Sequence, residues 1–291
     1  MAIASRDEQK ARKVSAKLGI PRHYNDYMRL LESSDVDIVY IPLPNSLHHE
    51  WTILAAEHGK HVLCEKPLAL NTRECEEMVS ACQKSGVWLL EGYMYRHFQH
   101  VIKLKEMIKK GVIGNVSVVR SEFTFPLTDS QDIRLQKQLG GGALYDVGCY
   151  CVDFSRLLTN SKWIKVKAFA HYHQRGVDNT LTGLILFENN QIGAFDCGFQ
   201  TNLRHSVEII GEKGTLTIPA AFEPEFKPTQ IILKRGEKSQ KFQFEPCNPY
   251  RLMVQHFVNC ILQKESPSYT SNDSIENMRL IDALYESARM A

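Results

Sequence analysis

The sequence lacks long hydrophobic runs, paired cysteines and an excess of charge of one sign. No apolar stretch approaches the ~20 residues that a membrane span needs, so no membrane partner is expected. The eight cysteines include no Cys-x-x-Cys pair, which predicts reduced thiols in a cytoplasmic protein and no metal site. The net charge is only +2, which gives no reason to expect a nucleic acid partner.

What is present fits a soluble globular protein of two domains. The chain has 291 residues, of which 43% are hydrophobic and 23% charged. Its first third alternates between short apolar runs and helical patterns at a spacing of about 25 residues, which is typical of βαβ units on a parallel sheet. Strands are expected over 2–5, 36–41, 60–64 and 87–90, and helices over 8–18, 27–31, 46–58 and 73–84, with Ser46 capping the third helix.

Glycine is missing where a parallel nucleotide-binding sheet would require it. Such folds open with a strand, a Gly-x-Gly-x-x-Gly turn and a helix, and the start of this chain has no such turn. The only glycine cluster is 140–142, far downstream. It is either a flexible turn or a place where the backbone approaches a site closely.

The remainder of the chain has a different pattern. Closely spaced strand-like runs with short turns follow a helix over 99–110 and predict mainly antiparallel pairing. The predicted fold class is therefore α/β. A Rossmann-type parallel sheet, shortened at its N-terminus, is expected in a domain of residues 1–97. An α+β domain with an open, mainly antiparallel sheet is expected over 98–291.

Glu65-Lys66-Pro67 follows the apolar run 60–64. Ligands of open α/β sheets bind outside the carboxyl ends of the strands, so Glu65 and Lys66 are candidates for a binding rim. Pro67 fixes its own φ and restricts Lys66. Taken alone, the motif is better explained as an ordinary solvated charge pair.

A second motif gives this pair a context. The run 140–151 reads Gly-Gly-Gly-Ala-Leu-Tyr-Asp-Val-Gly-Cys-Tyr-Cys, and an antiparallel sheet is expected after it. The combination resembles the Gfo/Idh/MocA family of NAD(P)-dependent oxidoreductases over nearly the whole chain. Within that family it is most similar to the branch of dimeric dihydrodiol dehydrogenases, glucose–fructose oxidoreductase and xylose dehydrogenase.

The resemblance implies hydride transfer between a nicotinamide and a CH–OH or C=O group of a sugar, polyol or dihydrodiol. Tyr150 would exchange the proton with the substrate oxygen. Asp146, one helical turn earlier, would orient Tyr150 or the substrate, and Lys66 would lie beside the nicotinamide. The implied cofactor-binding residues are Ser5, Arg6, Pro42, Leu43, Asn45, His48, Glu65, Lys66 and Arg96.

The chemistry of such a pair is independent of the family. Free tyrosine, with a pKa of about 10, is a poor base near neutral pH. A neighbouring lysine ammonium stabilises the phenolate and lowers that pKa. Without Asp146 and the glycine run, Tyr150 is better explained as a core tyrosine. On local sequence alone, Asp146 is equally an ordinary carboxylate in the first turn of a helix. Ser5 and Arg6 lack the acid that usually selects NAD, which favours NADP with NAD possible.

Comparison with the family leads us to expect that the chain starts at the second strand, without the first strand and its glycine turn. We therefore expect an N-terminally shortened form of an active enzyme that binds dinucleotide weakly. The alternative is a non-catalytic binding or regulatory relative, or an inactive form that has lost the cofactor site. A homodimer or homotetramer formed through the open sheet is implied by the resemblance.

Overall fold

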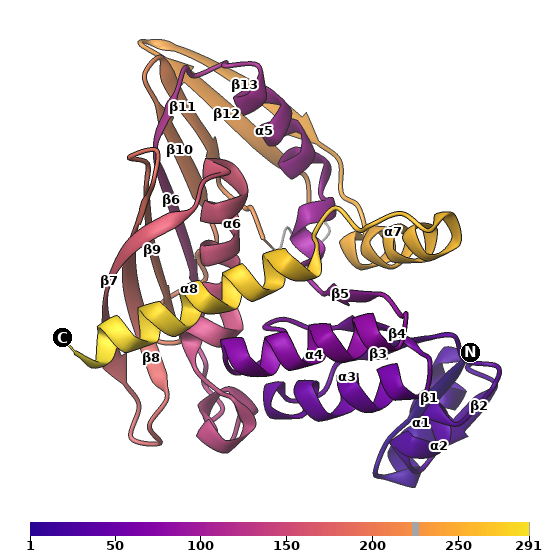
Figure 1. Ribbon diagram of the computed structural model, residues 1–291. Coiled ribbons are helices and arrows are strands. Elements are labelled where there is room, and N and C mark those ends of the chain that lie inside the picture. The colour runs from indigo at the N-terminus through magenta and orange to yellow at the C-terminus, as the bar shows by residue number, and fades with distance from the viewer. Residues whose placement is uncertain (223–226, 291) are drawn as a thin grey trace.

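The structure, a computed structural model, describes residues 1–222 and 227–290. Two regions lie side by side in it, a smaller N-terminal one and a larger one that is built on a long sheet (Figure 1). The predicted fold class, a Rossmann-like parallel sheet followed by a mainly antiparallel sheet, is confirmed. None of the helices in the described part of the chain has both the length and the apolarity to cross a membrane.

The N-terminal region pairs its strands in parallel, in two separate ladders. β1 pairs with β2, and β3, β4 and β5 form a second sheet in that order. Within residues 1–222 and 227–290 no ladder joins β1 to β3. The elements are β1 (Ala2–Ala4), α1 (Glu8–Leu18), β2 (Arg22–Tyr24), α2 (Tyr27–Leu31), β3 (Ile38–Ile41), α3 (His48–Glu57), β4 (His61–Cys64), α4 (Thr72–Lys84) and β5 (Leu89–Glu91).

Capping residues fix most of the helix starts in this region. The Asp7 carboxylate accepts from the Lys10 amide at 3.0 Å at the start of α1, and Asn71 does the same for α4. The prediction that Ser46 caps α3 is wrong. Ser46 lies inside a 3₁₀ turn, Asn45–Leu47, and α3 begins after that turn without a side-chain cap.

The C-terminal region is organised by one continuous sheet of eight strands. Their order is β13-β12-β11-β10-β6-β9-β8-β7, and every neighbouring pair is antiparallel except β6 and β9. The elements are α5 (Gln99–Lys109), β6 (Val116–Thr124), α6 (Cys149–Thr159), β7 (Trp163–Tyr172), β8 (Asp178–Phe187), β9 (Ile192–Gly198), β10 (Val207–Gly211), β11 (Gly214–Ile218), β12 (Thr229–Arg235), β13 (Lys238–Phe244), α7 (Pro249–Gln263) and α8 (Ser271–Arg289).

The two faces of this sheet differ. Helices α5, α6 and α8 lie on one side of it (Figure 1), and the inward residues of β8, such as Leu181 and Ile185, are fully buried. On the other side, Phe169 of β7, Leu184 of β8 and Ile192 of β9 are exposed. Alternation along each strand produces this division, because successive side chains point to opposite faces.

The last helix ties the two regions together. α8 runs from the sheet to the N-terminal region and lies beside α4 (Figure 1). The Asp282 carboxylate on α8 accepts from both the amide and the hydroxyl of Thr72, at 2.8 and 2.6 Å. The carboxyl ends of β3, β4 and β5 are thereby held against the C-terminal sheet, and the candidate site lies between them.

Candidate active site

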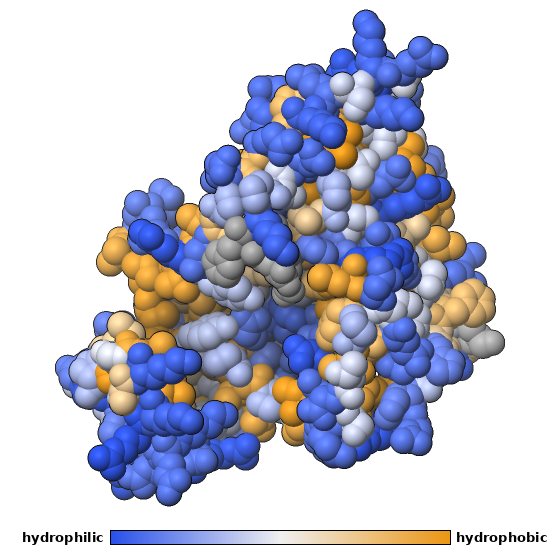
Figure 2. All heavy atoms as spheres, turned by 180° about the vertical axis from the view of Figure 1, so that it is seen from behind, coloured by the Kyte–Doolittle hydropathy of each residue, from blue (hydrophilic) through white to orange (hydrophobic). Residues whose placement is uncertain are grey.

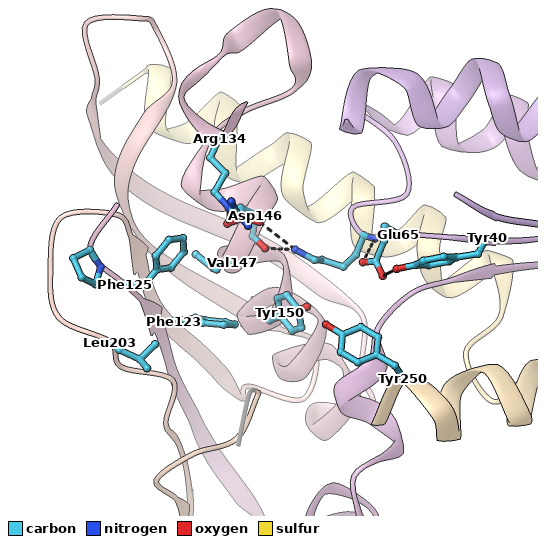
Figure 3. A pocket seen from close by; sticks show the side chains of 12 residues that line it. Tyr40, Glu65, Phe123, Phe125, Arg134, Asp146, Val147, Tyr150, Leu203 and Tyr250 are labelled. Carbon is cyan, nitrogen blue, oxygen red and sulfur yellow. Dashed lines mark hydrogen bonds and ion pairs between the residues drawn. The ribbon is translucent and has the colours of Figure 1, made fainter. Parts of the chain in front are cut away.

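A cavity of about 670 Å³ lies between the two regions. The space-filling view shows a hollow there with hydrophilic residues in its floor (Figure 2). Its lining combines charged side chains from the strand ends with aromatic and apolar ones from the large sheet (Figure 3). The lining residues are Tyr40, Glu65, Lys66, Phe123, Phe125, Pro126, Arg134, Asp146, Val147, Tyr150, Leu203 and Tyr250.

Lys66 follows β4 in the N-terminal region and contacts Asp146 of the C-terminal region across the cavity. Its ammonium donates to the Asp146 carbonyl at 2.6 Å and to Oδ1 of the same residue at 3.3 Å. Burial alone would lower the pKa of Lys66, but the negative charge of Asp146, supported by Glu65, raises it above the ordinary value. Lys66 therefore remains a cation at working pH.

Asp146 sits on a turn that the sequence did not predict. Residues Leu144–Gly148 form a π-helical turn directly before α6. A π turn shifts backbone pairing from i+4 to i+5 and is often found at functional sites. Here the Asp146 carbonyl accepts the Lys66 ammonium, while its carboxylate lies between Lys66 and Arg134, with Arg134 Nε at 2.7 Å. Burial would raise the pKa of Asp146, but the two cations lower it.

Tyr150 is on the first turn of α6 and only 4% exposed. Its ring packs edge-on against Phe123 and Tyr93, with centroids 5.4 and 5.7 Å apart. The Lys66 ammonium lies 4.9 Å from the Tyr150 ring centroid, and the hydroxyl donates to Met94 Sδ at 3.9 Å. The residue is thus part of an aromatic core and also faces the cavity, so both interpretations of the sequence describe it.

The glycine cluster is a place of close approach. Gly140 has φ +77°, and a Cβ there would lie 2.4 Å from Leu70 Cδ2. Gly142 has φ +131°, and a Cβ there would lie 2.2 Å from Asp178 Oδ1. The Asp178 carboxylate accepts from the Leu144 amide at 2.6 Å, where the π turn begins. The glycines therefore allow Asp178 to anchor the turn that carries Asp146.

Glu65 meets a tyrosine from the neighbouring strand. The hydroxyl of Tyr40 donates to Glu65 Oε1 at 2.7 Å, and both side chains line the cavity. β3 and β4 pair in parallel with Ile41 opposite Cys64, so their carboxyl ends meet at one edge of the sheet, as ligand sites of α/β sheets require. Pro42, Leu43 and Asn45 lie at the same edge, beyond β3.

The side chains of Asn45 and His48 fix the loop after β3 by hydrogen bonds to backbone carbonyls. The amide of Asn45 donates to the Gly140 carbonyl at 2.8 Å, across the two regions. His48 is fully buried, and its two ring nitrogens lie 2.9 Å from the carbonyls of Pro67 and Leu43. The expected contact of His48 with the cofactor stays a prediction. The residue connects the loop after β3 to the loop after β4.

Arg96 is also placed away from the cavity. Its Nε and one terminal nitrogen donate to the two oxygens of Asp153, at 2.8 and 2.5 Å, and its guanidinium lies 4.1 Å from the Tyr269 ring centroid. Asp153 is completely buried. Arg96 therefore forms a buried ion pair in this structure, and its expected role at the cofactor or substrate stays a prediction.

Ser5 and Arg6 follow β1, at the far end of the N-terminal region. The Ser5 amide donates to the Tyr24 carbonyl of β2 at 3.1 Å, and the Ser5 hydroxyl accepts from the Asp7 amide at 3.2 Å. The Arg6 side chain is exposed. They remain a predicted contact for the 2′-phosphate of NADP.

Several residues of the cavity were missed by the sequence analysis. Tyr40 had a weak signal, since it is a polar-tipped aromatic residue one position before the end of an apolar strand. Arg134 lies in a polar stretch that was assigned only to a loop, and nothing in its local sequence indicates a site. The other missed residues that line the cavity are Phe123, Phe125, Pro126, Val147, Leu203 and Tyr250.

Comparison with known proteins identifies the family. A family model for an oxidoreductase family with an NAD-binding Rossmann fold matches residues 1–93, and one for the GFO/IDH/MocA C-terminal domain matches residues 101–217. The chain is also 35% identical over 291 residues to D-xylose 1-dehydrogenase (NADP(+)) 2 of Haloferax volcanii, covering 99% of this chain and 89% of that protein. The chain belongs to the Gfo/Idh/MocA family of oxidoreductases. The predicted resemblance is confirmed.

Other members of the family extend the comparison. Trans-1,2-dihydrobenzene-1,2-diol dehydrogenase of Xenopus laevis is 30% identical over 98% of this chain and 88% of its own length. The solved aldose-aldose oxidoreductase of Caulobacter crescentus, in complex with glycerol, has a TM-score of 0.92 at 29% identity and covers 99% of this chain and 88% of its own. A 3-ketoreductase of Actinomadura kijaniata with NADP and TDP-benzene has the same TM-score and identity, with coverages of 99% and 89%.

Proposed function

We propose that the protein is an NADP-dependent dehydrogenase, with NAD as a possible cofactor, that transfers hydride between the nicotinamide and a CH–OH or C=O group. The substrate class is a neutral sugar, polyol or dihydrodiol. Tyr150 is the acid/base and Lys66 tunes it. The observation that carries the proposal is that Lys66, Asp146 and Tyr150 come from two regions of the chain and line one cavity.

Part of the site fits a nicotinamide dinucleotide. The open edge after β3 and β4 carries Glu65 and the Pro42–Asn45 loop, and Gly92 lets β5 end so close to Glu65 that a Cβ would lie 3.3 Å from its Cα. Glu65, Leu43 and Asn45 would hold the ribose and nicotinamide, and Ser5 with Arg6 the 2′-phosphate. When bound, the cofactor supplies or accepts the hydride.

The residues of the chain supply the proton chemistry. Tyr150 exchanges a proton with the substrate oxygen, and the Lys66 charge close to its ring stabilises the phenolate form. Because Asp146 raises the pKa of Lys66, Lys66 acts through its charge and Tyr150 is the better proton donor. Asp146 keeps the ammonium at the cavity wall.

The cavity lining supports a neutral substrate that has both hydroxyl groups and an apolar ring face. Lys66 and Arg134 balance Glu65 and Asp146 in formal charge, so the wall has no net charge to attract an ion. Phe123, Phe125 and Leu203 on the opposite side offer an apolar surface for a ring. A pyranose or a dihydrodiol presents hydroxyls on its edge and carbon on its faces, as these walls require. The names of the xylose and dihydrodiol dehydrogenases in the family agree with this substrate class.

We also propose the domain division 1–97 and 98–291, and assembly of copies through the exposed sheet face. The eight-stranded sheet leaves Phe169 67% and Leu184 51% exposed on one side. Exposed apolar surface of this kind indicates a contact with another chain. Light scattering would report a dimer or tetramer, and a monomer at micromolar concentration would contradict the assembly.

Tyr150→Phe tests the proposed function. It removes one hydroxyl and keeps the ring packing, so we expect NADP⁺ reduction with aldoses and diols to fall by about 10²–10⁴-fold while cofactor binding stays close to that of the wild type. Tyr172→Phe, on the far side of the large sheet, is the matched control. Near-normal turnover by the Tyr150 variant would refute the acid/base assignment.

One observation favours the alternative, a binding or regulatory relative without turnover. In the described residues the parallel strands are divided between β1–β2 and β3–β5, and residues 1–97 contain no Gly-x-Gly-x-x-Gly turn of the kind that binds a pyrophosphate. Titrating the fluorescence of NADPH with this chain separates the two functions. Micromolar affinity together with turnover supports the dehydrogenase, whereas absent binding supports the alternative.

A further inference from the structure

The Arg134 side chain contacts the π turn that carries Asp146. It lies in the short 3₁₀ turn Ile133–Leu135, between β6 and the π turn. Its Nε donates to Asp146 Oδ2 at 2.7 Å, and a terminal nitrogen donates to both oxygens of Asp132, at 3.4 and 3.3 Å. The side chain is 42% exposed and lines the cavity beside Phe125, whose ring centroid is 5.7 Å away.

The backbone around Arg134 is held as firmly as its side chain. Asp132 accepts from the Arg134 amide at 2.8 Å. The Arg134 carbonyl accepts from the Gly142 amide at 3.0 Å, and a Cβ on Gly141 would lie 2.4 Å from that same carbonyl oxygen. The glycine run that precedes the π turn therefore also packs against the Arg134 backbone and fixes its position.

We propose that Arg134 is a positioning residue for the reaction, which holds the Asp146 carboxylate by one oxygen so that the other oxygen and the carbonyl of Asp146 orient Lys66 toward Tyr150. The inference rests on the proposed acid/base function of Tyr150. It adds a residue from the 3₁₀ turn to the site, and it explains why the carboxylate is shared between two cations.

The charges around Asp146 explain what Arg134 contributes. Lys66 approaches Oδ1 at 3.3 Å, whereas Arg134 approaches Oδ2 at 2.7 Å, so the shorter contact belongs to Arg134. A carboxylate that lacked this guanidinium would be left to Lys66 alone and would compensate its ammonium more completely. The field that stabilises the Tyr150 phenolate would weaken, since Glu65 adds a further negative charge at the same edge.

Arg134→Gln and Arg134→Lys separate charge from geometry. Gln removes the charge and Lys keeps it without the planar fork. Arg279→Gln is the matched control, because Arg279 also contacts two carboxylates, Glu76 and Glu276, and is 47% exposed, but lies on α8 outside the cavity lining.

Two measurements test the proposal on the full chain. In steady-state kinetics with NADP⁺ and an aldose, Arg134→Gln should lower kcat by about tenfold or more and change KM little, because Arg134 acts through Asp146. In an NMR titration with ¹³Cζ-labelled tyrosine, assigned with Tyr150→Phe, the Tyr150 midpoint should move to higher pH in Arg134→Gln. It should stay near the wild-type value in Arg134→Lys and Arg279→Gln.

The outcomes distinguish this inference from the proposed function. An active Arg134→Gln variant with an unchanged Tyr150 midpoint overturns the role of Arg134, even if Tyr150→Phe is inactive. An active Tyr150→Phe variant overturns the proposed function itself. The titration does not depend on turnover or on bound cofactor, and Arg134→Lys supplies a second folded variant if Arg134→Gln loses its structure.

Discussion

The two regions of the molecule contribute opposite qualities to one cavity. The N-terminal region has two ladders of three- and four-residue strands, β1–β2 and β3–β5, which no backbone pairing unites in the described chain. The C-terminal region has eight strands in a single sheet, some of ten residues. The first supplies charges at strand ends, and the second supplies aromatic walls and the turn of Asp146.

The difference teaches where each region is vulnerable. Parallel strands are usually buried on both faces and between neighbours, whereas in the described residues β1 pairs only with β2 and β3 only with β4. The eight-stranded sheet has few such strands for its size. The N-terminal region therefore depends on its junction with the larger sheet to keep its strand ends in place.

That junction is built from buried polar groups. Glu91, at the end of β5, accepts from the Leu68 amide at 2.9 Å and from the Tyr269 hydroxyl at 3.1 Å. The Tyr269 ring in turn lies under Arg96, which is paired with Asp153 of α6. The chain of contacts runs from the parallel strands to the helix of Tyr150, and three experiments probe how far the two regions depend on it.

The largest effect is expected from Arg96→Ala. It leaves the Asp153 carboxylate, which is 0% exposed, without its cation at the boundary of the two regions. Breaking a buried pair in this way costs about 3–5 kcal/mol, and urea denaturation would measure the loss. Arg120→Ala, which breaks an exposed pair with Glu208, should cost about 0–1 kcal/mol. Equal losses of unfolding free energy in the two variants would contradict the dependence of the N-terminal region on this junction.

The next effect is a pH dependence that originates at Glu91. Burial, with the nearby charge of Asp153, raises the pKa of Glu91 from 4.5 to about 7. The folded state then binds more protons than the unfolded state between these pH values. The contribution to stability is fully present below about pH 4.5 and is lost as the pH rises through about 7.

Glu91→Gln should remove this dependence. The free energy of unfolding of the wild type, relative to the variant, should fall by about 3 kcal/mol between about pH 5 and about pH 8. Urea denaturation at several pH values measures the difference. The same experiment with Glu212→Gln, at an exposed carboxylate of the large sheet, is the control. Parallel profiles for wild type and Glu91→Gln would contradict the buried, proton-binding state of Glu91.

The smallest effect needs no substitution. Amide hydrogen exchange should be faster in β1 and β3, which each pair with one strand in the described residues, than in β6 and β9 near the centre of the continuous sheet, because local opening exposes poorly paired segments first. Mass spectrometry of peptic peptides resolves the two sets. Equal protection would show that the edges of the N-terminal region are closed in solution.

The fold was predictable where pattern and length were strong. Alternation of strands and helices identified the parallel region, and short turns identified the antiparallel one. β2 has only three residues, too few for a periodic signal, and the π turn at Asp146 is too short for its period to be distinguished from that of an α-helix.

The site was predictable as far as motifs reach. Lys66, Asp146 and Tyr150 could be named as candidates because each belongs to a recognisable sequence motif. The two buried carbonyls beside the His48 ring could not be foreseen, since a sequence does not reveal which groups a histidine faces. Arg134 was missed because its partner, Asp146, comes after a glycine run whose path only the folded backbone defines.

The reach of Lys66 has a consequence for motion. Lys66 belongs to the N-terminal region and its partner, Asp146, to the C-terminal region. The hydrogen bond from Asn45 to the Gly140 carbonyl also joins the two regions. A hinge movement that widened the cleft to admit a substrate would break both contacts and carry the cation away from Tyr150. With Tyr150 as the proposed acid/base, the tyrosine would hold its proton firmly while the cleft is open and become reactive only on closure, so that substrate entry and activation would be coupled.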